Sequence, residues 1–176
     1  MMDYDGMILN GADFRGADLS NKSFKKAKLN QAQLSEVYAG RADFRHAELN
    51  SVYMISNHCM YAKFKRAKLQ FAYMPFGDFS LCDFNHADMI ECRGMETDFT
   101  ASKFYCAVLA YADLVDACFA ETDCRNAIFM DASLINANFA GANLQNADFT
   151  NADITGAIFK GANIQGAKGL QIAIAR

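Results

Sequence analysis

The chain has 176 residues, of which 52% are hydrophobic, enough to bury the core of one ordinary domain. Its net charge of −3 is too small to imply long-range attraction to a charged partner. No stretch approaches the about 18 consecutive apolar residues that span a membrane. No Cys-x-x-Cys pair occurs, which excludes the usual zinc-ribbon and redox motifs.

The first six residues, from Met1 to Gly6, carry the acidic Asp3 and Asp5 where a signal peptide would be basic. No long apolar run follows them, so we expect a cytoplasmic protein. We expect residues 1–176 to form a single domain. Its repeats would span about residues 7–168, with residues 1–6 and 169–176 as end caps.

From Leu9 onward the sequence repeats with a period of five. We call every fifth residue from Leu9 to Ile164 the centre of a quintet, and 28 of these 32 centres are Leu, Phe, Met or Ile. The residue two positions before the centre is alanine in 21 of the 32 quintets. No insertion or deletion breaks this register, so one regular element should run through the chain.

A period of five fits neither a helix nor a long flat strand. Five steps along an α-helix rotate the side chain by about 140°, so no apolar stripe forms. On a flat strand, an odd period sends successive centres to opposite faces. Within one quintet, however, the small residue and the centre are two apart and share one side of a short strand. If the chain then turns a right angle, each pair points inward again, and four quintets close a square coil.

A square coil of 20 residues predicts a second period, which the sequence shows. Two columns at intervals of 20 consist of phenylalanine: Phe24, Phe44, Phe64, Phe84 and Phe104, and then Phe79, Phe99, Phe119, Phe139 and Phe159. We therefore expect an all-β fold, a solenoid of about eight 20-residue coils stacked at the ~4.8 Å spacing of β-strands.

Quintets such as Gly11-Ala12-Asp13-Phe14-Arg15 and Ala142-Asn143-Leu144-Gln145-Asn146 resemble those of the pentapeptide-repeat family. The resemblance covers about residues 7–168 and implies a right-handed quadrilateral parallel β-helix. It also implies a protein that is not an enzyme. The best understood members of that family resemble duplex DNA in shape and charge and protect type II topoisomerases, as the quinolone-resistance proteins do.

The residues that often carry chemistry form no site in this sequence. His46 and His86 share a column with Arg66 between them, so they lie about 10 Å apart, too far to share a metal ion. The aspartates that precede many centres recur with the repeat, so we interpret them as turn caps rather than as acid–base pairs. We expect no catalytic residue, no metal site and no cofactor. The inward positions hold Cys59, Cys82, Cys92 and Cys124, and the outward positions hold Cys106 and Cys118.

Outward residues can be assigned to four faces, numbered one to four from the quintet of residues 7–11. Face four gathers basic side chains, a pattern that favours anion binding. Aromatic side chains are not interleaved with them for base stacking, so we favour a solvated face over a nucleic-acid partner. The anion-binding candidates are Lys25, Arg45, Lys63, Lys65, Arg66, Lys103 and Arg125.

Faces one and two carry outward apolar side chains instead. Several recur at intervals of 20 and form columns, and Tyr111 also points outward on face one. A contiguous exposed apolar patch of roughly several hundred Å² usually marks an interface, with a partner protein or with a second copy of the chain. The partner-binding candidates are Tyr53, Ile55, Phe71, Tyr73, Pro75, Ile90, Met95, Val115 and Ile135.

Three functions stay open at this point. The first is a non-catalytic rod that binds an unknown protein partner through the apolar patch. The second is a DNA mimic that binds and protects a topoisomerase such as gyrase. The third is anion or nucleic-acid binding through face four. The second function draws on an acidic C-terminal half of faces one and two, formed by Asp88, Glu91, Glu96, Asp113, Asp116, Asp131, Asp148 and Asp153.

Overall fold

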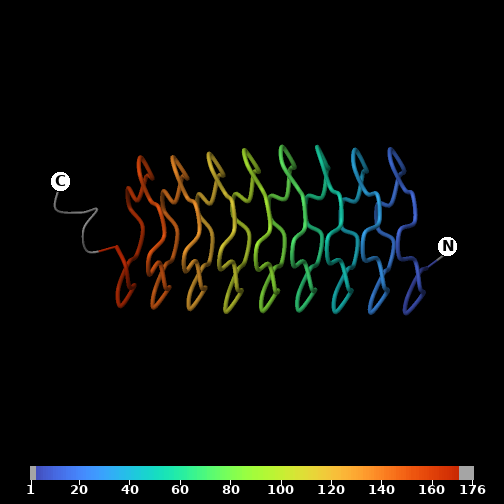
Figure 1. Ribbon diagram of the computed structural model, residues 1–176, viewed down its shortest axis with the longest axis horizontal. Helices are drawn as coiled ribbons and strands as arrows, with labels where there is room; N and C mark the ends of the chain where they lie inside the picture. The colour runs from blue at the N-terminus through green and yellow to red at the C-terminus, as the bar shows by residue number, and fades with distance from the viewer. Residues whose placement is uncertain (1–2, 171–176) are drawn as a thin grey trace.

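The computed structural model describes residues 3–170, which form one rod of stacked coils (Figure 1). Secondary structure in this range consists of single-residue parallel bridges at every fifth residue, from Ile8 to Lys168. Each bridge joins a residue to the one 20 positions further on, as Ile8 joins Lys28. The fold is therefore the expected right-handed quadrilateral β-helix. Of the predicted end caps, residues 1–2 and 171–176 lie outside the described residues, and Leu170 is buried.

Each wall of the rod is a short extended segment of three residues: the small residue, the bridging residue and the centre. Leu9 N donates to Lys28 O at 2.7 Å, and Lys28 N donates to Met7 O at 2.9 Å. The same pair of bonds recurs along most of the rod. Neighbouring coils thus satisfy the backbone groups that burial would otherwise leave unpaired.

The two residues after each centre form a corner. Ala12 N donates to Leu9 O at 3.0 Å, which closes a β-turn around Asn10 and Gly11. The second corner residue has a positive φ from Gly6 to Gly166 without exception, between 52° and 64° in every non-glycine case. A type II turn requires this conformation at its third residue. Glycine and asparagine adopt it readily, whereas bulky residues do so at a cost.

The core is a set of stacked aromatic rings. Phe84 lies between Phe64 and Phe104, with ring centroids 4.8 and 5.0 Å away and nearly parallel planes. At the N-terminal end, Tyr4 stacks on Phe24 at 4.6 Å and closes this column. Alanine beside each centre leaves the room that such stacking needs in a narrow interior.

At two small positions that lack alanine, the buried polar side chains of Asn57 and Ser102 bond to the preceding coil. The Asn57 side-chain oxygen accepts a hydrogen bond from Val37 N at 3.2 Å. The Ser102 hydroxyl accepts from Cys82 N at 2.8 Å and donates to Phe79 O at 2.7 Å. These bonds stand in for turn bonds that the corners at Val37 and Cys82 lack.

The aspartates before the centres accept hydrogen bonds from the corners that follow them. Asp18 accepts a hydrogen bond from Ser20 N at 2.9 Å, and Asp148 accepts one from Thr150 N at 3.0 Å. Hydrogen bonds from the backbone and hydroxyl of Ser20 lower the pKa of Asp18, and those from Thr150 lower the pKa of Asp148. The turn-capping interpretation is confirmed for these residues.

The stacked core predicts an asymmetry between two phenylalanines. Phe84→Ala should lower the free energy of unfolding by about 3–5 kcal/mol, because it opens a cavity inside the ring column. Phe71→Ala, at an exposed corner, should change it by less than about 1 kcal/mol. Urea unfolding followed by circular dichroism measures both, and equal losses would contradict this account of the core.

Candidate functional site

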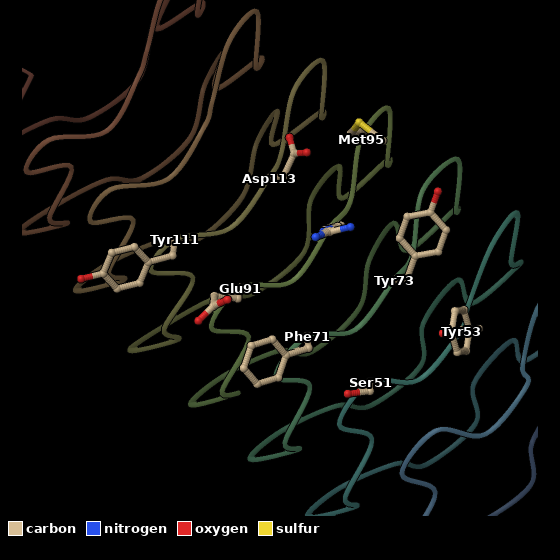
Figure 2. A pocket seen from close by; sticks show the side chains of 9 residues that line it. Ser51, Tyr53, Phe71, Tyr73, Glu91, Met95, Tyr111 and Asp113 are labelled. Atoms are coloured by element: carbon tan, nitrogen blue, oxygen red, sulfur yellow. The ribbon is translucent and has the colours of Figure 1, made fainter. Parts of the chain in front are cut away.

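A shallow groove of about 730 Å³ runs along the corner between faces one and two, near the middle of the rod (Figure 2). Its lining comes from four consecutive coils, so it follows the rod axis rather than crossing it. The lining residues are Ser51, Tyr53, Phe71, Tyr73, Glu91, Arg93, Met95, Tyr111 and Asp113.

The 20-residue period brings these side chains together. Residues 20 apart in sequence stand one coil apart, so two adjacent columns form the two sides of the groove. Figure 2 shows Phe71, Glu91 and Tyr111 along one side, with Tyr73 on the other. The first side is Ser51, Phe71, Glu91 and Tyr111, and the second is Tyr53, Tyr73, Arg93 and Asp113.

The groove contains exposed aromatic rings together with charged side chains that form no ion pair in the described residues. Phe71 is 51% exposed and Tyr111 is 59% exposed, far more than packing alone would leave. Within the described residues, Arg93 forms no ion pair, although acidic side chains stand in the coils beside it. In the described part of the chain, Asp113 also lacks the hydrogen bond from the following corner that other aspartates accept, such as Asp148 from Thr150. These groups remain available to a partner.

Backbone strain supports a functional role for the aromatic corners. Phe71 and Tyr111 adopt φ of 58° and 61°, a left-handed conformation that costs an L-residue roughly 1–2 kcal/mol. About half of each side chain is exposed, so packing offsets only part of this cost. Every corner of the rod has this conformation, so what distinguishes these two is a bulky exposed ring at a position that glycine or asparagine would occupy at lower cost.

The structure divides the predicted apolar patch. Tyr53, Phe71, Tyr73 and Met95 line the groove, but Pro75 does not. The expectation that Pro75 is accessible was wrong, because the corner residues stack coil on coil and cover it. The remaining candidates are half-buried and lie outside the lining: Ile55, Ile90, Val115 and Ile135.

Sequence reasoning missed Arg93 and Ser51 and counted Glu91 and Asp113 only as acidic charges. The signal that could have found them was position. Arg93 stands one coil from Tyr73 in the same column, and Glu91 stands one coil from Phe71. Reading the columns beside the aromatic residues, rather than the apolar residues alone, would have outlined the groove.

The basic stripe on face four is partly neutralised. Arg45 and Arg125 each donate two or more side-chain hydrogen bonds to the aspartate two residues before, with closest contacts of 2.7 Å. The Arg125 bonds lower the pKa of Asp123. Lys25 lies 3.6 Å from the Asp43 carboxylate. The exposed candidates without an ion pair in the described residues are Lys63, Lys65, Arg66 and Lys103.

Residues 3–170 contain no group of three or more His, Cys, Asp or Glu side chains placed to hold a metal ion. The four cysteines expected to point inward are buried, and burial raises the pKa of Cys92 and of Cys124 to about 12. Such thiols are core side chains rather than nucleophiles.

Across the same range, no helix is long and apolar enough to cross a membrane.

Comparison with known proteins identifies the repeat. A family model described as pentapeptide repeats, in eight copies, matches residues 8–45, 62–93, 107–140 and 132–168. HetL, a pentapeptide repeat protein involved in heterocyst differentiation regulation in the cyanobacterium Nostoc sp., is 20% identical, with a TM-score of 0.50; the match covers 94% of this chain and 91% of HetL. A trypsin-treated form of QnrB1, a plasmid-mediated fluoroquinolone resistance protein, is 15% identical, with a TM-score of 0.48; that match covers 96% and 90%. No curated protein matches the chain.

The corner strain gives a test that does not depend on a partner. Phe71→Asn should raise the free energy of unfolding by up to about 1 kcal/mol, because asparagine tolerates the left-handed conformation better than phenylalanine. Asn146→Phe, the reverse change at a corner that already holds asparagine, should lower it. Thermal and urea unfolding measure both variants, and a marked loss of stability in Phe71→Asn would show that the ring is there for the fold.

Proposed function

This chain belongs to the pentapeptide-repeat family, whose repeat builds a non-catalytic scaffold, and from that premise we propose that it is a rod that binds a protein partner through the groove between faces one and two. One observation carries the proposal. Phe71, Tyr73 and Tyr111 gather around Arg93 in one exposed groove, with Tyr53 at its end. Tyrosine, arginine and other aromatic residues dominate the energetics of protein interfaces.

The shape of the groove favours a polypeptide over a small molecule. Small-molecule sites are concave and bury most of their ligand, whereas this groove is shallow and follows the rod over four coils, roughly 14 Å from the first to the last. A peptide segment or the edge of a folded partner fits such a surface. Arg93 between Glu91 and Asp113 would select a partner that presents both signs of charge.

The groove proposal predicts the effect of a double substitution. Phe71→Asn with Tyr111→Asn should weaken capture of the partner from an extract of the source cells by on the order of 30-fold or more, as expected for two hot-spot residues. The fold should survive, since both changes relieve corner strain. Tagged protein and quantitative mass spectrometry give the measurement.

The matched control for this experiment is Lys65→Glu with Arg66→Glu on face four. This variant should keep the partner. A partner that survives the groove substitutions but is lost with the face-four substitutions would instead assign binding to the basic stripe.

A second candidate function rests on the acidic corners. Glu96, Asp116 and Glu121 are exposed and form no ion pair within the described residues, and the same holds for Glu91 and Asp131. Carboxylates repeated along a rod favour mimicry of duplex DNA and binding to a topoisomerase, because a DNA-binding channel attracts negative charge.

A gyrase supercoiling assay tests this second candidate. With a fluoroquinolone present, the protein should restore supercoiling, or should inhibit the enzyme at high concentration. Glu96→Gln with Asp116→Asn should weaken either effect, because it removes two negative charges without changing side-chain size. No effect of the wild-type chain over a wide concentration range would exclude the mimic and leave the groove.

A further inference from the structure

A second exposed apolar surface lies on face three, away from the groove. It covers three consecutive coils and includes the corners that border this face. Among its members, Phe76 is 54% exposed and Tyr38 is 55% exposed. Its apolar residues are Tyr38, Met60, Tyr61, Phe76 and Leu81.

The backbone at three of these residues is strained as it is in the groove. Tyr61, Phe76 and Leu81 occupy corners with φ of 64°, 59° and 58°. Glycine or asparagine would fit these positions at lower cost. The exposed side chains are thus kept at the expense of local stability, which again indicates an interface.

The outward column in the middle of face three has four consecutive members, from Tyr38 to Asp98, that change from aromatic donors to carboxylates. Tyr38 and His58 stack with ring centroids 5.0 Å apart, and both offer hydrogen-bond donors to solvent. The next two residues along the rod, Asp78 and Asp98, carry carboxylates. One oxygen of each accepts a corner bond, at 3.0 Å for Asp78 and 2.8 Å for Asp98, and the other has no bond in the described residues.

We propose that face three is the seam of a homodimer in which two rods pack antiparallel, with the twofold axis between His58 and Asp78. This axis lies in the interface and is perpendicular to the long axis of the rod. Each residue therefore faces the same column of the partner subunit, in the coil that lies equally far from the axis on the other side. His58 faces the partner subunit's Asp78, and Tyr38 faces the partner subunit's Asp98. At one border of the face, Tyr61 packs against the partner subunit's Leu81.

Self-complementarity is the reason for choosing a second copy as the occupant. An isologous interface requires that the surface matching a residue is found on the same face of the same chain. Here the donors of Tyr38 and His58 match the carboxylates three coils and one coil further along, at Asp98 and Asp78 of the same column. A parallel pairing fails this test, because it sets Asp78 and Asp98 each against its own copy and places like charges together.

The surface is large enough for a stable dimer. One face holds roughly 2100 Å², a quarter of the total accessible surface of 8398 Å², and the four coils from Tyr38 to Asp98 make up about half of that face, roughly 1000 Å². A standard interface needs about 800 Å² per partner. The groove lies at the corner between faces one and two, so a dimer through face three leaves it open to a different partner.

The first experiment removes the apolar borders of the seam. Sedimentation equilibrium on the full chain should show a dimer that dissociates on dilution. Phe76→Asn with Leu81→Asn should raise the dissociation constant by on the order of tenfold or more. Both substitutions suit the corner conformation, so circular dichroism should show an intact fold. Phe71→Asn with Tyr111→Asn, the same change at the groove, should leave the dimer unaffected.

The second experiment tests the antiparallel arrangement by a gain of affinity. The proposed axis brings Glu96 near the partner subunit's Glu36 at the rim of the interface. These two negative charges repel each other across the dimer. Glu96→Lys should therefore lower the dissociation constant roughly three- to tenfold. Glu121→Lys changes the net charge equally but faces Asn21 across the axis, so it should have little effect.

The proposal is overturned if the wild-type chain stays monomeric at all accessible concentrations. It is also overturned if the variant with Phe76→Asn and Leu81→Asn associates as tightly as wild type. If Glu96→Lys binds no more tightly than Glu121→Lys, the antiparallel seam is wrong.

Discussion

The left-handed backbone conformation at every fifth residue is the constraint on which the rest of the structure depends. From Gly6 to Gly166 it turns the chain at each corner, so the small residue and the centre point inward on every wall. The walls then stack through regular backbone bonds, and the phenylalanine rings stack inside them. The same constraint leaves the corner side chains pointing outward, where core packing does not select them.

The fold could be predicted from the sequence because the interior permits few solutions. A centre must fill one quarter of a coil and stack on an identical position about 4.8 Å away, so leucine and phenylalanine recur in register. Alanine beside them follows from the same lack of room. Cys59 and Cys124, which replace the usual large apolar residue at a centre, are also buried. Their position in the five-residue repeat, rather than the residue type, places them in the core.

The candidate sites were harder to predict because outward positions do not obey the repeat. The accessibility of Pro75 depends on the corner residues stacked above and below it, which a single quintet does not reveal. Whether Arg45 can bind an anion depends on whether its guanidinium already donates hydrogen bonds to Asp43. Phe76 and Leu81 are corner residues of two different quintets, and only the square cross-section places them at the two borders of face three.

The distribution of corner residues connects stability with binding. The first and last coils hold glycine or asparagine at most corners, whereas residues 67–86 place Phe71, Phe76, Leu81 and His86 at all four. In a solenoid, each coil is stabilised mainly by its neighbours, so a strained coil is best tolerated in the middle, where it has a neighbour on both sides. The middle of the rod is therefore where this chain can keep bulky exposed side chains at left-handed corners. The groove and face three both lie there, on different sides of the same strained coil.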